Sequence, residues 1–119
     1  MEKRKITFSP PDITEREIAE VVDTLRSGWI TTGPKTKKFE NEIAEYCGTK
    51  KAVALNSATA AMELALRLFD IGEGDEVITS AYTYTASASV IYHCGAKIIL
   101  ADTKKGEFNI DPKEIEKLI

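Results

Sequence analysis

The segment from Lys51 to Leu66 constrains the fold more than any other part of the sequence. It begins with a short apolar run at 52–55, passes through small and polar residues at 56–59, and continues with apolar residues at helical spacing. Such a segment predicts a strand that turns at once into a helix. The first N–H groups of that helix lack backbone partners, and with the positive end of the helix dipole they form an anion site.

Two interpretations of the turn at Ser57–Thr59 remain open from the residues alone. Ser57 or Thr59 can serve simply as the N-cap of the helix, which is what these residue types most often do. Alternatively, both hydroxyls add donors for a bound phosphate, and the small side chain of Ala58 keeps the approach to the backbone open.

The rest of the chain predicts alternating helices and strands. Helices are expected at 14–27, 35–46, 58–69, 86–93 and from Pro112 onward, and strands at 52–55, 76–80 and 97–102. Capping boxes are expected at the first helix, from Thr14 and Glu17, and at the last, from Asp111 and Glu114. Gly28 and Gly48 are expected to end the first two helices. The strands are almost continuously apolar, which indicates a sheet covered on both faces. The pattern therefore predicts a three-layer α/β/α fold with a mainly parallel sheet. Because such a sheet would expose apolar edges, we expect either the front piece of a longer protein or edges covered by a partner.

The composition narrows the range of functions. The net charge is -3 at pH 7, so no basic surface indicates nucleic-acid binding. No apolar run could span a bilayer, and the charged N-terminus is not followed by the apolar core of a secretory signal. We therefore expect a cytoplasmic protein without membrane contacts.

The residues that often bind metals or act as nucleophiles give little signal. Cys47 and Cys94 are far apart and lack the spacing of metal ligands, which predicts two reduced thiols and no metal site. The only histidine, His93, lies among apolar residues, where we expect it to pack or to cap a helix.

Chemistry is expected in the turns after the strands, because ligands of open parallel sheets bind beyond the carboxyl ends of the strands. A phosphate at residues 56–59 would bring the rest of its molecule near residues 81–85, where Tyr82 or Tyr84 could stack on a flat ring. Either tyrosine could instead only pack at the strand end. Asp102 closes the last strand, where it could be functional or could only start a turn.

The loop from Gly28 to Pro34 contains the only tryptophan, Trp29, and two threonine hydroxyls. The indole can pin the loop to the core, or it can form the wall of a pocket for a polar ring-shaped substrate. Lysines 35, 37 and 38 open the next helix, where they can form a solvated face or attract an anionic ligand.

A set of motifs in this order resembles one enzyme family. The motifs are Gly28-Trp29-Ile30-Thr31-Thr32-Gly33-Pro34, Phe39-Glu40, Ala52-Val53-Ala54-Leu55-Asn56-Ser57-Ala58-Thr59-Ala60-Ala61 and Gly72-Glu73-Gly74-Asp75-Glu76-Val77-Ile78. Together they resemble the sugar-nucleotide aminotransferases of the DegT–StrS type, which are pyridoxal 5'-phosphate (PLP) enzymes of the aspartate aminotransferase fold. The resemblance runs from about Ile6 to Ile119 and corresponds to the front third of a family member. It implies the incomplete front part of the large domain of a fold-type-I PLP enzyme.

The resemblance also implies roles for individual residues. Ala58 and Thr59 would bind the cofactor phosphate through backbone N–H and hydroxyl, with Ser57 beside them in the cofactor site. Tyr84 falls where the family stacks an aromatic ring on the pyridine. Asp102 matches an aspartate whose role is structural. The substrate-side loop would border the sugar-nucleotide site, commonly at the interface of a homodimer; its residues are Trp29, Ile30, Thr31 and Thr32.

The resemblance divides the chain into a helix and substrate-side loop at 1–34 and a partial PLP-binding domain at 35–119. The family's Schiff-base lysine and the aspartate that pairs with the pyridine nitrogen lie later than residue 119. No lysine of this chain matches the Schiff-base motif. The chain therefore contains no catalytic residue of its own, and we expect it to be inactive alone.

The resemblance leads to one main hypothesis and two alternatives. The parent enzyme would transfer an amino group from glutamate to a nucleotide-linked keto-sugar for surface polysaccharide synthesis. Some members of the family instead dehydrate the sugar and have histidine at the lysine position. The third hypothesis, from another class, is a free-standing small-molecule-binding domain without catalysis.

Overall fold

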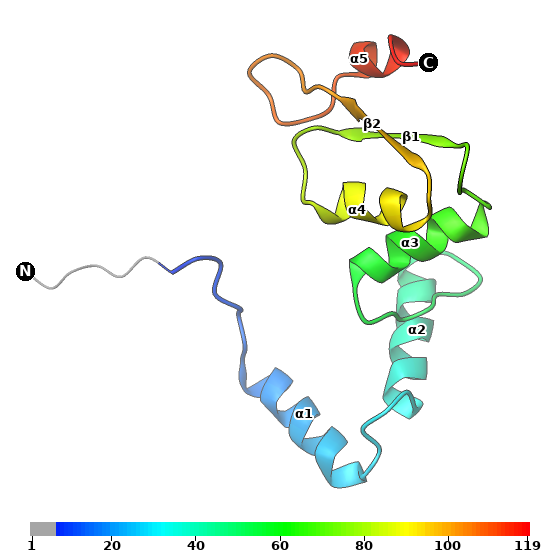
Figure 1. Cartoon of the computed structure of the whole chain (residues 1–119). Coiled ribbons are helices and arrows are strands. Elements are labelled where there is room, and N and C mark those ends of the chain that lie inside the picture. Colours follow the sequence, from blue (N-terminus) through cyan, green and yellow to red (C-terminus); the bar gives the residue numbers. More distant parts are fainter. Residues whose placement is uncertain (1–6) are drawn as a thin grey trace, which may run out of the picture. The chain divides into compact units, whose positions relative to one another are not determined.

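The computed structural model describes residues 7–119. The chain divides into two compact units at Ala54–Leu55, and each unit is considered by itself (Figure 1). The domain boundary that the resemblance places after residue 34 stays a prediction. Among residues 7–119, none of the helices combines the length and the apolar character that crossing a membrane requires.

The first unit contains two helices whose ends are set by local sequence. Helix α1, Glu15–Ser27, begins after Thr14, whose N–H donates to Glu17 Oε2 at 2.6 Å and whose hydroxyl accepts from the Arg16 N–H. This reciprocal capping satisfies donors that the helix leaves free. Helix α2, Pro34–Cys47, starts on a proline. Both helices end at a glycine in the left-handed conformation, as predicted: Gly28 and Gly48.

The second unit is an α/β arrangement. It consists of α3 (Ala58–Leu68), β1 (Glu76–Ser80), α4 (Ala86–His93), β2 (Lys97–Ala101) and α5 (Pro112–Glu116). The two strands are parallel and in register, with Val77 opposite Ile98. Because α4 connects two parallel strands, it runs back along the sheet between them. Strand β1 and helix α4 have the predicted limits.

One apolar core holds this unit together. Val90 and Ile91 of α4 are each 2% exposed, and they pack with Ala96, which is also buried. Partly buried residues of α3, the following turn and both strands surround them: Met62, Leu66, Ile71, Val77 and Ile98. Helices α3 and α4 thus cover the strands, while α5 lies beyond β2 on the side away from α4 (Figure 1). The predicted α/β fold with parallel strands is confirmed.

The strand predicted at 52–55 is wrong. Among residues 7–119 only β1 and β2 form a sheet, which therefore has two strands rather than three. A strand needs a neighbour that pairs with its backbone, and none of the described residues provides one for this segment. The N–H of Ala54 donates instead to the Glu40 carboxylate at 2.9 Å.

The predicted capping box of the last helix is also wrong in one half. Asp111 caps α5 by accepting from the Lys113 N–H at 2.9 Å, as expected. Glu114, however, pairs with Lys117 at 2.5 Å. An opposite charge three residues ahead attracts the carboxylate away from the cap.

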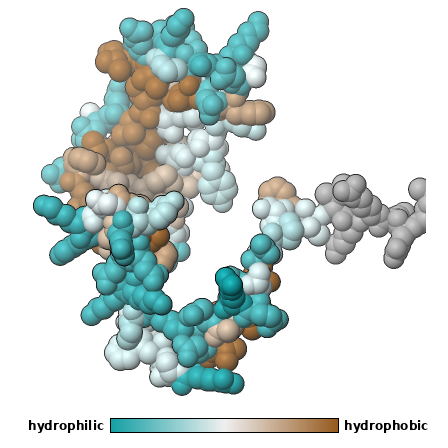
Figure 2. All heavy atoms as spheres, turned by 180° about the vertical axis from the view of Figure 1, so that it is seen from behind, coloured by the Kyte–Doolittle hydropathy of each residue, from teal (hydrophilic) through white to brown (hydrophobic). Residues whose placement is uncertain are grey.

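Much apolar surface stays accessible in this structure. In Figure 2 hydrophobic side chains gather on the visible surface of the second unit. Large side chains of that unit with more than half of their surface exposed include Leu100, Phe108, Leu68 and Phe69. Burial of such surface on a further element or partner would be favourable.

The assigned core can be tested by substitutions at two neighbouring residues of α4, one buried and one exposed. Replacement of Ile91 by alanine should lower the free energy of unfolding by about 2–5 kcal/mol, because it leaves a cavity in the core. Replacement of Tyr92, which is 75% exposed, by alanine should cost much less. Denaturant titration of both variants checks this, and equal losses would contradict the assigned core.

Candidate functional site

The first turn of α3 presents unpaired donors to solvent. Ser57 is the N-cap: its Oγ accepts from the Ala60 N–H at 3.1 Å, and its carbonyl accepts from the Ala61 N–H at 3.2 Å. The N–H groups of Ala58 and Thr59 have no acceptor among residues 7–119. Ala58 is exposed and Thr59 is half-buried. The turn is therefore open to an anion at two backbone donors.

The capping interpretation thus holds for Ser57, and it leaves the phosphate interpretation open. A hydroxyl that accepts a hydrogen bond keeps its own proton as a donor. The Thr59 hydroxyl does not cap the helix. Two N–H groups, two hydroxyls and the dipole of an eleven-residue helix suit a phosphate group. The residues present therefore fit the phosphate of the cofactor that the resemblance implies.

The start of α4 differs from that of α3. The N–H of Ser87 donates to the Tyr84 carbonyl at 3.0 Å, and those of Ala88 and Ser89 donate to the Thr85 carbonyl. Thr85 makes no side-chain cap. The donors of this helix start are mostly used within the turn, so α3 is the better anion site of the two.

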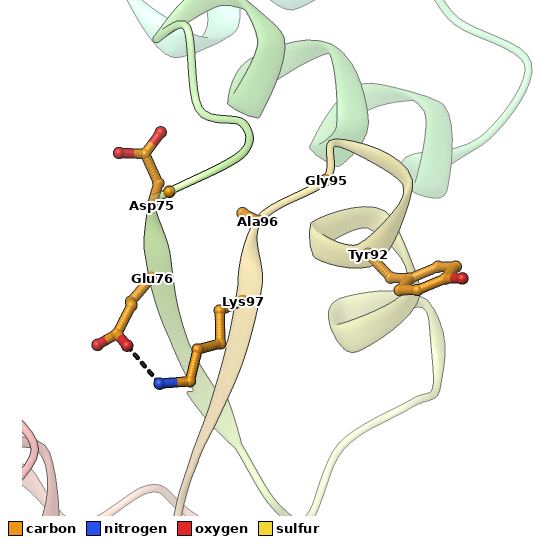
Figure 3. A pocket seen from close by; sticks show the side chains of 7 residues that line it. Asp75, Glu76, Tyr92, Gly95, Ala96 and Lys97 are labelled. Carbon is orange, nitrogen blue, oxygen red and sulfur yellow. Dashed lines mark hydrogen bonds and ion pairs between the residues drawn. The ribbon is translucent and has the colours of Figure 1, made fainter.

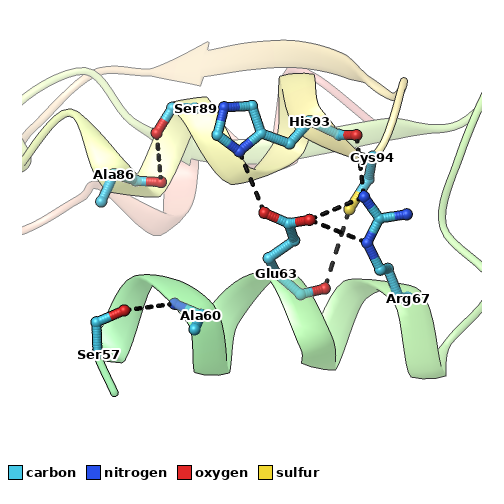
Figure 4. A network of polar contacts seen from close by, with 8 residues as sticks. All are labelled: Ser57, Ala60, Glu63, Arg67, Ala86, Ser89, His93 and Cys94. Atoms are coloured by element: carbon cyan, nitrogen blue, oxygen red, sulfur yellow. Dashed lines mark hydrogen bonds and ion pairs between the residues drawn. The ribbon is translucent and has the colours of Figure 1, made fainter. Parts of the chain in front are cut away.

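The starts of α3 and α4 lie at the same end of the unit. The two helices run side by side with Ser57 and Ala86 at one end and Arg67 and Cys94 at the other (Figure 4). Since α4 runs antiparallel to β1, that end is also the carboxyl end of the strands. The structure thus brings the 57–59 turn and the 81–85 turn together at the carboxyl ends of the strands, where parallel sheets bind ligands.

The two tyrosines of the second turn have different surroundings. The ring of Tyr82 stacks on Phe108, with 5.2 Å between centroids and 26° between planes. Tyr84 is 82% exposed. One face of Tyr82 is therefore used in packing, whereas Tyr84 keeps both faces for a ligand. Phe108 was not expected here, because its approach to the strand end depends on the path of the 103–110 loop.

Asp102 lies at the same edge and is engaged with its own loop. Its Oδ1 accepts from the Thr103 N–H at 2.8 Å, and its carbonyl accepts from the Asp111 N–H at 3.0 Å. The side chain thus shapes the turn after β2. These contacts favour the structural role.

The Trp29 loop belongs to the first unit and has a defined conformation. The indole Nε1 donates to the Thr32 carbonyl at 3.0 Å, and the Trp29 N–H donates to Ser27 Oγ. A Cβ added to Gly33 would lie 2.1 Å from Nε1. Since the Gly33 backbone is extended, with φ -163°, glycine is required here for the close approach of the indole.

A hollow of about 630 Å3 lies beside this loop. All four predicted substrate-side residues line it, together with residues at the end of α1 and the start of α2: Trp29, Ile30, Thr31, Thr32, Thr24, Ser27, Pro34, Lys35 and Thr36. Trp29 is 56% exposed, so the ring is held within the loop and still faces solvent. The hydrogen bond that holds the indole within the loop therefore does not prevent the ring from forming a wall of the hollow.

Lys35 is neutralised within the first unit. Its ammonium group lies 2.8 Å from both Glu20 Oε2 and Asp23 Oδ2. The hydrogen bond from Lys35 lowers the pKa of Asp23, and the bonds to Asp23 and then Glu20 raise the pKa of Lys35. These contacts favour a structural role over attraction of an anionic ligand. Lys38 similarly lies 3.8 Å from Glu42.

Two features were missed in the sequence. His93 does not pack among apolar residues: its Nδ1 lies 3.2 Å from Glu63 Oε2, and Glu63 also accepts two bonds from Arg67. The spacing of Glu63 and Arg67, four residues apart, was the available signal. Both cysteines are free, as expected.

The second missed feature is a hollow of about 390 Å3 at the amino ends of the strands. There Lys97 and Glu76 form an ion pair at 2.6 Å, and the Tyr92 ring points away from this pair (Figure 3). This hollow lies at the amino ends of the strands, whereas the predicted site lies at their carboxyl ends.

Comparison with known proteins assigns the family. Residues 11–119 match the DegT/DnrJ/EryC1/StrS aminotransferase family. The chain belongs to this family. The recognition made from the sequence motifs is thereby confirmed.

Curated proteins are similar to this chain over nearly its whole length. The spore coat polysaccharide biosynthesis protein SpsC of Bacillus subtilis is 49% identical over 93% of the chain, and the UDP-4-amino-4-deoxy-L-arabinose–oxoglutarate aminotransferase of Shewanella sediminis is 45% identical over 92%. The chain spans about 28% of the length of both relatives.

A solved structure has the same fold. The PLP form of Spr1654 from Streptococcus pneumoniae, a candidate sugar aminotransferase, is 59% identical, with a TM-score of 0.91 over 98% of this chain and 30% of its own. The same protein was also solved in a PMP form. These structures confirm the fold-type-I assignment and PLP as the cofactor at the level of the family.

The contact between Gly33 and the indole can be tested by one added methyl group. Replacement of Gly33 by alanine should displace Trp29 and break its bond to the Thr32 carbonyl, because the added Cβ overlaps Nε1. The indole N–H signal in NMR should shift and exchange faster with water. Gly72→Ala is the control, since its added Cβ would lie 3.5 Å from the Cys94 carbonyl oxygen, an ordinary van der Waals contact. An unchanged indole signal in Gly33→Ala would refute the contact.

The Lys35 contacts predict a pH effect with a definite sign. Because the pKa of Asp23 is below its ordinary 3.8, the pair stabilises the fold above that pH, and this contribution is lost as the pH falls through the lowered pKa. In a Lys35→Met variant, the titration midpoint of the Asp23 carboxyl in NMR should move up. Lys38→Met, which removes a different ion pair, should leave it in place; a shared shift would contradict the assignment.

Proposed function

We propose that this chain forms the phosphate site, an aromatic wall and a substrate-side loop of a PLP-dependent aminotransferase. Its substrate would be a nucleotide-linked keto-sugar, with glutamate as the amino donor. The single observation that carries this proposal is the open first turn of α3, where the N–H groups of Ala58 and Thr59 are free at the carboxyl edge of parallel strands.

The phosphate would bind to the backbone N–H groups of Ala58 and Thr59 and to the hydroxyls of Ser57 and Thr59. Charge-assisted bonds of this kind are among the stronger hydrogen bonds in proteins. Helix α3 has no acidic residue in its first turn, so no fixed negative charge there opposes the anion. The site thus holds the cofactor by its tail and leaves the ring free toward the next turn.

Tyr84 would form one wall of the ring site. Its side chain is exposed, and its carbonyl is tied to the Ser87 N–H at 3.0 Å. The backbone of the tyrosine is therefore anchored to the start of α4 while the ring stays available. Stacking on the pyridine would orient the cofactor and exclude water from one of its faces.

Bound PLP would supply the electron sink that amino-group transfer requires. This chain's residues would bind and orient it, whereas the proton-transfer base is expected outside the 119 residues. We therefore propose that the chain alone is inactive.

The Trp29–Thr32 loop would contact the sugar nucleotide. The hollow beside it offers a flat indole, the Thr31 and Thr32 side chains and the apolar Ile30. Aromatic rings and hydroxyls recognise sugar rings by stacking and hydrogen bonding. We propose that the loop does so in a cytoplasmic homodimer.

The names of relatives support the direction of this proposal. One is a spore coat polysaccharide biosynthesis protein, and another is an aminotransferase for a UDP-linked amino sugar with oxoglutarate as its partner. We accordingly propose that this protein acts in surface polysaccharide synthesis and that the glutamate–oxoglutarate pair supplies the amino group.

The phosphate site is tested by removing one hydroxyl. In the full-length protein, Thr59→Val should raise the dissociation constant for PLP about tenfold or more, because it removes a hydrogen bond to a charged group. Absorbance titration of the apoprotein with PLP measures the change. Thr49→Val is the matched control, since the Thr49 hydroxyl donates to the Lys51 carbonyl in another loop.

Retained PLP affinity in Thr59→Val, within twofold of the wild type, would refute the phosphate assignment. The reaction class is tested separately by the release of 2-oxoglutarate from glutamate with a nucleotide-linked keto-sugar. Its absence in the PLP-loaded protein, across uridine- and thymidine-linked sugars, would refute the aminotransferase proposal.

A further inference from the structure

Four residues connect α3 to the end of α4 (Figure 4). Glu63 Oε1 accepts from Arg67 Nε at 3.0 Å and from an Arg67 terminal nitrogen at 2.8 Å, while Oε2 lies 3.2 Å from His93 Nδ1. The same Arg67 nitrogen donates to the His93 carbonyl at 3.3 Å. The Cys94 thiol adds a long contact to the Glu63 carbonyl at 3.9 Å.

The bond from Arg67 to the His93 carbonyl stabilises the C-terminal end of α4. The last carbonyls of a helix have no intrahelical partner, and the C-terminal end carries the negative pole of the helix dipole. The guanidinium of Arg67 therefore both satisfies a free acceptor and places a positive charge at this pole. Glu63 holds the guanidinium in that orientation by a two-donor contact.

The carboxylate of Glu63 is well suited to this task. The bonds from Arg67, followed by the contact with His93, lower its pKa, so it stays ionised at neutral pH. Its side chain is 29% exposed, less than those of Arg67 and His93. The side chains that face it are the Arg67 guanidinium on its own helix and the His93 imidazole on α4.

Arg67 and His93 lie near the far ends of the two helices whose starts form the proposed cofactor site, and Glu63 lies in the middle of α3. The apolar seam of Met62, Leu66, Val90 and Ile91 holds α3 against α4, but apolar contacts are not directional. Directional bonds between the two helices add to the resistance of this packing against a slide of one helix along the other. Because helices are stiff, a slide at the Arg67 end would move Ser57–Thr59 relative to Tyr84.

We propose that Glu63 and Arg67 are positioning residues that lock the register of α3 against α4, and thereby the spacing between the phosphate turn and Tyr84. The role in the cofactor site rests on the proposed function. The register lock itself concerns only this chain's residues and is tested without the cofactor.

The first test measures amide hydrogen exchange in the full-length apoprotein. Glu63→Gln should speed exchange at Ala60, Ala61 and Ser87, in the first turns of both helices, by about two- to fivefold, the range that exposed ion pairs supply. Arg67→Lys, which keeps the charge but loses the two-donor geometry, should act in the same direction. Unchanged exchange in both variants would overturn the proposal.

A charge swap separates the register lock from simple helix stabilisation. The double variant Glu63→Arg with Arg67→Glu restores an ion pair within α3 but cannot donate from position 67 to the His93 carbonyl. We expect fast exchange to persist in the swap. If the swap restores slow exchange, pairing inside α3 is sufficient and the proposal is wrong.

The second test uses the cofactor. In PLP-loaded protein, Glu63→Gln and the charge swap should change the circular dichroism of the cofactor band and weaken PLP binding about fivefold, whereas Glu76→Gln, which removes the pair with Lys97 at the other sheet edge (Figure 3), should do neither. Equal effects in Glu76→Gln, or none in Glu63→Gln, would overturn the role in the site. A wild-type protein that binds no PLP would refute the proposed function, while the exchange test would still decide the register lock.

Discussion

The packing of α4 against the parallel pair β1–β2 is the constraint on which the second unit depends. Val90 and Ile91 are almost fully buried, and they bring Val77 and Ile98 of the two strands to one apolar centre. A crossover helix between parallel strands must run back along them, so its start lies where the first strand ends. The core thus determines which loops meet at the carboxyl ends of β1 and β2.

The position of the candidate site follows from this constraint. Helix α3 packs on the same core through Met62 and Leu66 and runs beside α4 (Figure 4). Its first turn and the turn before α4 therefore open on the same side. Residues separated by a whole helix and strand in the sequence, such as Thr59 and Tyr84, come to one edge without any contact between their own loops being required.

The parts of the fold that were predicted correctly are those with local signals. Thr14 and Glu17 form a capping box, and Gly28 and Gly48 end their helices, because these interactions involve residues within one turn. The strand at 52–55 was wrong because pairing is non-local: an apolar run forms a strand only where a neighbouring backbone receives it. The contact of Tyr82 with Phe108 and that of His93 with Glu63 escaped prediction for the same reason. In the site, the turn at Ser57 was predictable as a helix start. The residues alone left Tyr82 and Tyr84 as alternatives, because the packing of Tyr82 on Phe108 depends on the path of a distant loop, and only the family resemblance favoured Tyr84.

The two helix starts at the carboxyl edge show how small sequence differences separate an anion site from an ordinary turn. Before α4, the backbone at Thr85 is already helical, with φ -50° and ψ -31°, so the carbonyls of Tyr84 and Thr85 accept from the next N–H groups. Before α3, Ser57 is extended, with φ -161° and ψ 156°. An extended N-cap ends the helical bonding abruptly, and its side chain and carbonyl reach only the third and fourth N–H groups after it. The N–H groups of Ala58 and Thr59 therefore remain free. The same cap that stabilises α3 thus leaves a pair of backbone donors that can bind an anion.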